Sequence, residues 1–228
     1  KNKRGAAAVQ REPPLVLMKG GMGVKNFALK GHMCYSKNKN ELVTQENAYI
    51  VCVDGKSKGV FSELPQEYAQ LPLIDHGDRL IIPGMVDLHV HAPQYAFRGM
   101  CMDLELMDWL NRYTFPEEEK YVDLSYAERA YSIFVDALRT GATTRAVIFA
   151  TRHRPATELL MELMERSGIV SYVGKVNMDR EASKALTEES AEASAHATIG
   201  WLNAVKDKYQ NTKPILTPRF IPCCTDQL

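Results

Sequence analysis

Residues 83–91 read Pro-Gly-Met-Val-Asp-Leu-His-Val-His, and this stretch is the sharpest local signal in the sequence. Its apolar residues are typical of a buried strand. Successive side chains of a strand point to opposite faces, so His89 and His91 lie on one face at the end of the strand. Two imidazoles on one face can share a metal ion, and zinc and iron both suit such ligands. An isolated His-x-His also occurs as two hydrogen-bonded structural histidines, so its surroundings in the sequence must decide between these interpretations.

Strands and helices alternate from Leu80 onward, which predicts parallel β/α architecture. Strands are predicted at 80–91, 146–149, 169–176 and 215–220, with helices at 125–140, 155–167 and 188–209 between the later strands. Ser125 and Glu128 form a predicted capping box at the start of the first of these helices. Four strands with their helices are half of an eight-stranded β/α barrel, whose active site lies at the carboxyl ends of the strands. We therefore expect residues 80–228 to be the first half of a TIM-like (β/α)8 barrel, and the chain to be a portion of a longer polypeptide.

Two further regions precede the predicted barrel. Residues 1–24 are rich in Lys, Arg, Gly and Pro, and we interpret them as an N-terminal extension. Residues 25–79 contain short β-type runs, two of them joined by the turn-forming pair Asp54-Gly55, and predict a small β domain. We expect this domain to be a β-sandwich that flanks the barrel.

Composition excludes several classes of function. The 228 residues contain 28 Lys and Arg against 28 Asp and Glu, and a formal net charge of zero argues against nucleic acid as a partner. No apolar run approaches the ~20 residues that span a bilayer, so no membrane association is expected. The five cysteines are odd in number and form no C-x-x-C pair, which disfavours a disulfide framework. These features predict a cytoplasmic protein.

The 83–91 stretch, after a small β domain and before a β/α series, resembles the entry motif of the amidohydrolase superfamily of metal-dependent hydrolases and deaminases. Further strings in the same order resemble the guanine deaminase branch of that superfamily. They are His-Ala-Pro-Gln-Tyr at 91–95, Trp-Leu and Tyr-Thr-Phe-Pro within 109–116, Phe-Ala-Thr-Arg-His at 149–153, Val-Gly-Lys-Val-Asn-Met-Asp at 173–179 and Lys-Pro-Ile-Leu-Thr-Pro-Arg-Phe at 213–220. The resemblance runs from about residue 26 to the end of the chain.

The resemblance implies a reaction and a metal site. His89 and His91 match the first two ligands of one metal ion per subunit, Zn²⁺ or alternatively iron. The metal would activate a water that attacks C2 of guanine, which releases ammonia and leaves xanthine. The remaining ligands and the proton-moving carboxylates are expected beyond Leu228, so no catalytic residue is predicted within these 228 residues and they are expected to be inactive alone. The family also implies a cytoplasmic homodimer.

The resemblance further implies substrate-binding residues. Gln94 and the Arg219-Phe220 pair match positions that hold the guanine ring. A Gln amide both donates and accepts hydrogen bonds, an Arg guanidinium forks onto acceptor atoms, and a Phe adds an apolar contact. Trp109 is a weaker candidate for lining the pocket, because a Trp on an amphipathic helix usually belongs to the core.

Alternatives remain open on the sequence. The chain could belong to a related amidohydrolase that deaminates another amino-heterocycle, or to a catalytically incomplete fragment or scaffold protein. Lys175 could resemble the modified lysine that bridges two metals in some amidohydrolases, but a structural role is favoured because the deaminase branch uses one metal. His153 is also expected to be structural.

Overall fold

The computed structural model describes residues 26–228, so the predicted N-terminal extension, 1–24, lies outside the described residues. The chain divides into two compact units between Pro83 and Gly84. The sequence predicted this boundary between residues 79 and 80. Each unit has its own four-stranded sheet, and the larger unit has a two-stranded ladder as well.

The smaller unit is built on one four-stranded sheet of order β3-β2-β1-β4, in which only the β1 and β4 pair is parallel. Its strands are β1 (Phe27–Asn38), β2 (Glu41–Val53), β3 (Lys56–Phe61) and β4 (Leu73–Ile81). Asp54 and Gly55 form the predicted tight turn, with φ of 53° and 71°, the left-handed backbone that a primed hairpin turn requires. Among the described residues this unit holds a single sheet, so the second layer of the expected sandwich is not observed there.

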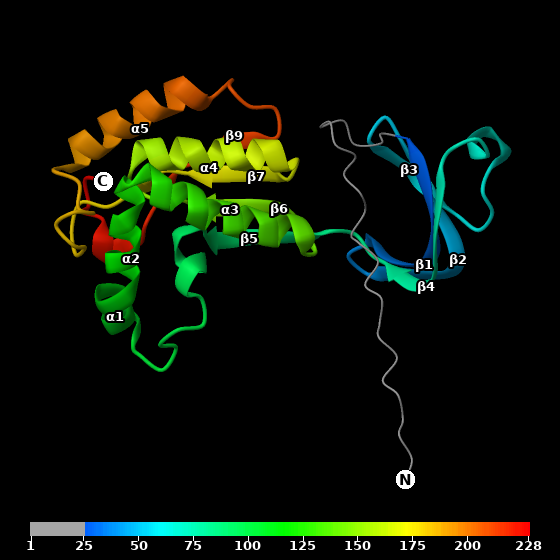
Figure 1. Ribbon diagram of the computed structural model, residues 1–228, viewed down its shortest axis with the longest axis horizontal. Helices are drawn as coiled ribbons and strands as arrows, with labels where there is room; N and C mark the ends of the chain where they lie inside the picture. The colour runs from blue at the N-terminus through cyan, green and yellow to red at the C-terminus, as the bar shows by residue number, and fades with distance from the viewer. Residues whose placement is uncertain (1–25) are drawn as a thin grey trace, which may run out of the picture. The chain divides into compact units, whose positions relative to one another are not determined.

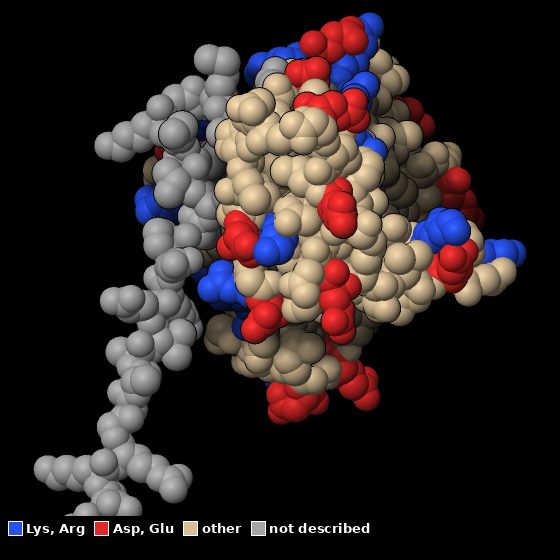
Figure 2. All heavy atoms as spheres, turned by 90° about the vertical axis from the view of Figure 1, so that its right-hand side faces the viewer, with Lys and Arg blue, Asp and Glu red and all other residues tan. Residues whose placement is uncertain are grey.

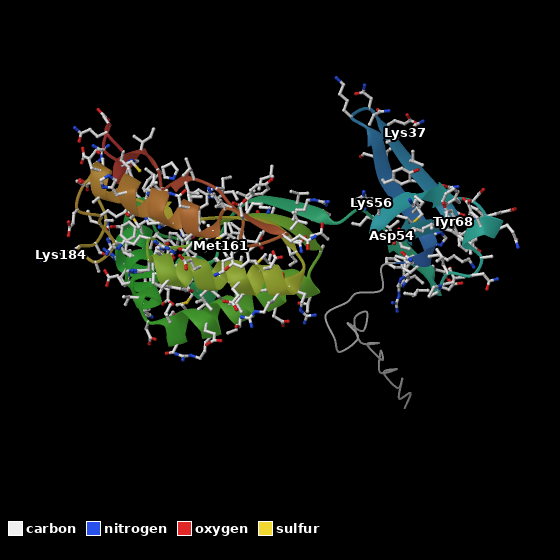
Figure 3. The ribbon with its side chains drawn as sticks, turned by 90° about the horizontal axis from the view of Figure 1, so that it is seen from above. Lys37, Asp54, Lys56, Tyr68, Met161 and Lys184 are labelled. Atoms are coloured by element: carbon white, nitrogen blue, oxygen red, sulfur yellow. The ribbon has the colours of Figure 1, made fainter. Side chains whose placement is uncertain are left out.

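Charged side chains of both signs lie on the face of the molecule that Figure 2 presents. Figure 2 shows Lys and Arg intermixed with Asp and Glu on the face that it presents, without a continuous positive patch. Lys37, at the free end of the β1–β2 hairpin (Figure 3), pairs with Glu41 at 3.2 Å. Both signs of charge on this face agree with the equal numbers of basic and acidic residues in the sequence.

The larger unit has a parallel sheet of order β5-β6-β7-β9, flanked by helices (Figure 1). A short parallel ladder of β8 and β10 lies at the carboxyl ends of the third and fourth strands. The strands are β5 (Met85–His91), β6 (Thr143–Phe149), β7 (Val170–Gly174), β8 (Val176–Asn177), β9 (Thr212–Pro214) and β10 (Thr217–Pro218), and the long helices are α3 (Leu124–Thr140), α4 (Arg154–Ser167) and α5 (Ala191–Val205). This is the predicted first half of a β/α barrel.

The helices and the sheet share one apolar core. Ile148 of β6 and Val173 of β7 are fully buried in the same cluster as Met161 of α4 and Trp201 of α5. Figure 3 labels Met161 within the packed side chains of this unit. The cluster fixes the barrel strands and therefore the positions of the loops at their carboxyl ends.

The first barrel strand begins at Met85, and the prediction that it begins at Leu80 was wrong. Residues Leu80 and Ile81 belong to β4 of the smaller unit. Pro83 interrupts the strand because its ring nitrogen has no hydrogen to donate to a ladder. Gly84 is needed for a close approach, since a Cβ there would lie 2.2 Å from the Cγ2 atom of Thr144.

The third and fourth barrel strands are each broken in two, whereas the sequence predicted continuous strands at 169–176 and 215–220. The second pieces pair as Thr217 with Val176 and Pro218 with Asn177. Thr217 lies against Gly174, where a Cβ would be 2.2 Å from the Thr217 Cγ2 atom. This close packing at the break requires a glycine at position 174. The requirement comes from a tertiary contact, so strand propensity could not predict it.

Helix starts also differ from the predictions. Asp123, rather than Ser125, caps α3, because its Oδ1 atom accepts a hydrogen bond from the Ser125 backbone N–H at 2.8 Å. Helix α5 begins after Ser190, whose side chain accepts from the Ala193 backbone N–H at 3.1 Å. Between β5 and α3 lie two short helices, α1 (Leu106–Trp109) and α2 (Phe115–Glu119), joined by a π-helical turn at Leu110–Thr114. None of the helices within residues 26–228 is long and apolar enough to cross a membrane.

Candidate active site

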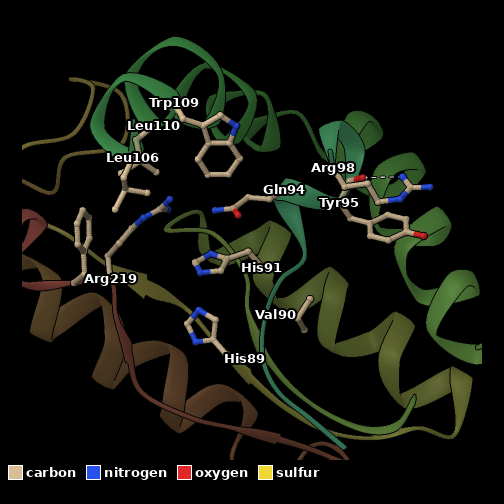
Figure 4. Close-up of a pocket in the computed structure, with 11 residues that line it drawn as sticks. His89, Val90, His91, Gln94, Tyr95, Arg98, Leu106, Trp109, Leu110 and Arg219 are labelled. Carbon is tan, nitrogen blue, oxygen red and sulfur yellow. Dashed lines mark hydrogen bonds between the residues drawn. The ribbon is translucent and has the colours of Figure 1, made fainter. Parts of the chain in front are cut away.

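A cavity of about 570 Å³ lies at the carboxyl ends of the strands of the larger unit. It is within the ~300–1,000 Å³ range of small-molecule sites. Figure 4 shows side chains from β5, from the segment that follows it, and from the end of the fourth strand pointing into this space. The cavity brings together all six predicted site residues, which are His89, His91, Gln94, Trp109, Arg219 and Phe220.

The two histidines lie side by side at the end of β5 (Figure 4). Their ring centroids are 5.1 Å apart, as expected for side chains two residues apart on one strand face. Phe149, at the end of β6, stacks on the His91 ring at 4.7 Å with an interplanar angle of 24°, and its centroid is 4.8 Å from that of His89. Phe149 therefore supports both imidazoles from the neighbouring strand.

The surroundings of His91 keep its imidazole neutral. Burial, followed by the positive charge of Arg219 and the neighbouring His89, lowers the pKa of His91 to about 3. The Nδ1 atom of His91 is buried and has no hydrogen-bond partner. A neutral imidazole with an unpartnered nitrogen is the form that binds a metal ion.

The histidine pair fits a partial metal site. No group of three or more His, Cys, Asp or Glu side chains in residues 26–228 is placed to hold a metal ion. A catalytic zinc usually has three protein ligands and a water. His89 and His91 can therefore supply two ligands of a larger set.

Polar side chains face the histidines across the cavity. Gln94 lies in the 3₁₀ turn Pro93–Phe97 directly after β5, and Arg219 follows β10. In Figure 4 the Gln94 amide and the Arg219 guanidinium approach each other above His91. An amide and a guanidinium side by side offer both donors and an acceptor to a ligand.

Trp109 lies on the cavity wall and is also tied to the loop before it. Its indole N–H donates to the Met100 carbonyl oxygen at 3.1 Å, and its ring contacts that of Phe97 at a centroid distance of 5.5 Å. The aromatic side chain thus joins the loop after β5 to the short helix α1.

Sequence reasoning missed Glu118, which contacts two of the predicted residues. Glu118 is 0% exposed, its Oε1 accepts from the Gln94 amide at 3.4 Å, and its Oε2 accepts from the Arg219 guanidinium. It is the middle member of three consecutive glutamates, and such a run is typical of a solvated helix face. The one available signal was its position two residues after Pro116, which ends the Tyr-Thr-Phe-Pro string that the family resemblance includes.

Lys175 and His153 lie outside the cavity lining. The Lys175 ammonium donates to Glu188 at 2.6 Å, and the side chains are 2% and 8% exposed. Burial lowers the pKa of Lys175, while the hydrogen bond that Lys175 donates to Glu188 opposes that change. This buried pair agrees with the structural role expected for Lys175.

Fold and site together define part of a β/α-barrel protein with a candidate metal site at the carboxyl end of its first strand. The sequence pattern of the amidohydrolase family matches residues 80–227. The chain belongs to the amidohydrolase family.

Comparison with individual proteins confirms the expected resemblance to guanine deaminases. The chain is 41% identical to a guanine deaminase of Dictyostelium discoideum over 160 residues, which cover 70% of this chain and 35% of that protein. It is 32% identical to a guanine deaminase of Mus musculus over 225 residues, 96% of this chain and 48% of that protein. A crystal structure of guanine deaminase from C. acetobutylicum, with guanine bound in the active site, superposes with a TM-score of 0.83 at 42% identity. This superposition covers 89% of this chain and 48% of the C. acetobutylicum protein. The chain therefore spans about a third to a half of the length of these relatives.

Proposed function

We propose that the protein containing this chain is a guanine deaminase, which converts guanine and water to xanthine and ammonia. The observation that carries the proposal is one cavity in which the histidine pair faces Gln94 and Arg219. The similarity to a guanine deaminase that holds guanine in its active site supports the same substrate class.

His89 and His91 are proposed to hold one metal ion, with zinc expected and iron as the alternative. When bound, such an ion lowers the pKa of water so that it can act as a nucleophile near neutral pH. The neutral state of His91 and its orphaned nitrogen support this assignment.

Gln94 and Arg219 are proposed to bind the polar edge of the base and to hold its 2-amino carbon toward the histidines. The Gln94 amide can accept from a ring N–H, and the Arg219 guanidinium can donate to a ring carbonyl oxygen. Phe220 and Trp109 are proposed to cover the faces of the base and to exclude water.

The remaining expectations rest on the family resemblance and, for the location, also on the cysteine pattern. A homodimer with one metal ion per subunit, located in the cytoplasm, stays a prediction. The activity is proposed for the full-length protein, since two histidines do not complete a catalytic metal site.

Metal analysis and activity assays test the proposal together. The full-length protein should release ammonia from guanine and form xanthine, and should contain about one metal ion per subunit. His91→Ala should lose metal and activity together. His153→Ala is the matched control, because His153 is also partly buried but does not line the cavity, and it should keep the metal. Release of ammonia from another amino-heterocycle but not from guanine would contradict the proposal.

A further inference from the structure

Glu118 joins two cavity residues that come from distant parts of the chain. It lies 24 residues after Gln94 and 101 residues before Arg219. Its neighbour Glu117 serves a different purpose, since it pairs with Lys120 at 2.6 Å and accepts from the Tyr126 hydroxyl. Of these two adjacent acids, only Glu118 contacts the residues that line the cavity.

Each oxygen of the Glu118 carboxylate has one partner. The Oε1 atom accepts from the Gln94 amide nitrogen at 3.4 Å, and the Oε2 atom accepts from Nη1 of Arg219. The Arg219 backbone N–H donates to the Asn177 carbonyl at 3.0 Å, and the guanidinium lies over the Phe115 ring at 5.3 Å from its centroid. Contacts thus hold Arg219 both at its backbone and at its guanidinium group.

An ionised carboxylate only accepts hydrogen bonds, and this fixes what Gln94 offers to the cavity. Because one amide N–H of Gln94 donates to Glu118, the side-chain amide is held in one orientation, and its carbonyl oxygen is the acceptor that it offers to a ligand. Arg219 has five N–H donors, so those that Glu118 does not use remain for a ligand. The negative charge of Glu118 also balances the positive charge of Arg219. The cavity wall therefore presents directed hydrogen-bond donors without an excess of charge.

We infer that Glu118 is a positioning residue that sets the hydrogen-bonding polarity of the cavity, with Gln94 as acceptor and Arg219 as donor. This arrangement complements a ring edge that carries an N–H donor beside a carbonyl oxygen. It opposes an edge with a ring nitrogen acceptor beside an amino group, as in adenine. The inference rests on the proposed function for the choice of substrate class.

Binding of two unreactive purines tests this role without requiring turnover. Hypoxanthine has the N–H and carbonyl edge, and adenine has the reversed edge. Calorimetric titration of the full-length protein should give tighter binding of hypoxanthine than of adenine. In Glu118→Gln, an amide replaces the carboxylate and can donate a hydrogen bond to Gln94. The Gln94 amide can then flip and present its N–H donors to the ligand instead of its carbonyl oxygen.

We expect Glu118→Gln to bind hypoxanthine about tenfold or more weakly, the loss that follows removal of a charge-assisted hydrogen bond, and to lose most of the preference over adenine. The KM for guanine should rise by a similar factor while kcat changes less. Glu118→Asp keeps the charge but is one methylene shorter, so it should fold and still bind more weakly.

Glu165→Gln is the matched control for a carboxylate with a purely structural role. Glu165 accepts from the backbone N–H groups of Gln210, Asn211 and Thr212 at 2.9–3.0 Å, and it does not line the cavity. This variant should melt at a lower temperature but keep the affinity and preference of the wild type. Equal binding losses in the Glu165 and Glu118 variants would overturn the inference.

The outcomes separate this inference from the proposed function. If the wild type deaminates guanine but both Glu118 variants keep its KM and its purine preference, the inference fails and the function stands. If the wild type turns over no guanine, yet prefers hypoxanthine and loses that preference in the Glu118 variants, the function fails and the inference stands. A wild type that binds neither purine overturns the inference as well.

Discussion

The larger unit contains two buried ion pairs, each between a glutamate and a basic side chain, and the two pairs differ in their surroundings. The side chains of Glu118 and Arg219 are 0% and 3% exposed, and those of Lys175 and Glu188 are 2% and 8% exposed. Burial alone therefore does not distinguish them. The first pair borders the cavity through Arg219, whereas neither member of the second lines it.

Within residues 26–228, Lys175 and Glu188 form hydrogen bonds only to other protein groups away from the cavity, and we call them the closed pair. One carboxylate oxygen of Glu188 accepts from Lys175, and the other accepts from the Ser194 hydroxyl at 2.6 Å and from the Met178 backbone N–H at 3.2 Å. Lys175 also donates to the Val176 carbonyl at 3.2 Å. Free donors that face a cavity, rather than a buried charge as such, mark the pair that can bind a ligand.

The largest expected effect comes from breaking the pair at the cavity. Arg219→Ala removes the proposed donors to the base and leaves the Glu118 carboxylate buried without its cation. We expect kcat/KM for guanine to fall about a thousandfold, which corresponds to about 4 kcal/mol. Steady-state assays of the full-length protein measure this loss, and Arg154→Ala, which breaks an exposed pair with Glu158, should leave kcat/KM nearly unchanged.

Breaking the closed pair should affect stability instead of substrate binding. Lys175→Met leaves the Glu188 carboxylate buried without its cation, so the free energy of unfolding should fall by about 3–5 kcal/mol. Urea denaturation measures the fall, and the double variant Lys175→Met, Glu188→Gln should recover part of it. A tenfold rise in KM for guanine in the folded Lys175 variant would show that the two pairs do not have separate roles.

A smaller effect is expected from loosening the helix that supports the closed pair. Ser190 caps α5, the helix that carries Ser194. Ser190→Ala should lower the free energy of unfolding by about 1 kcal/mol, the usual value of an N-cap. Thermal denaturation measures this change, and Ser190→Asp, which can also cap, should restore most of the stability. An unchanged melting temperature in the Ala variant would contradict the capping role.

The smallest effect is expected at an exposed pair, which serves as the reference for both buried ones. Arg154 and Glu158 are 2.7 Å apart with side-chain exposures of 44% and 29%. Exposed pairs contribute little, so Glu158→Gln should change the free energy of unfolding by no more than about 0.5 kcal/mol. A loss as large as that of Lys175→Met would remove the distinction between buried and exposed pairs.

The sequence predicted the parts of the site that depend on strand periodicity and family strings. The two-residue spacing of His89 and His91 was enough to predict neighbouring imidazoles, and Gln94, Arg219 and Phe220 were found by resemblance. Glu118 was missed because its helix carries three consecutive glutamates, and only tertiary packing decides which of them is buried. Periodicity could not supply that information.

Element boundaries were predicted less well than element types. The β/α alternation gave the correct order of strands and helices, and α4 ends at Ser167 as predicted, followed by Gly168 with a φ of 77°. The break at Lys175 was not predicted, because it depends on the pairing of Lys175 with Glu188 and on the contact of Gly174 with Thr217. Both contacts join residues that are distant in the sequence.

A crystal structure of the full-length protein with xanthine, the proposed product, tests the central claim most directly. We expect one metal ion on His89 and His91, with the polar edge of the purine within hydrogen-bond distance of the Gln94 carbonyl oxygen and the Arg219 guanidinium. A purine bound elsewhere, or a metal ion that neither histidine contacts, would contradict the claim that this cavity is the site of guanine deamination.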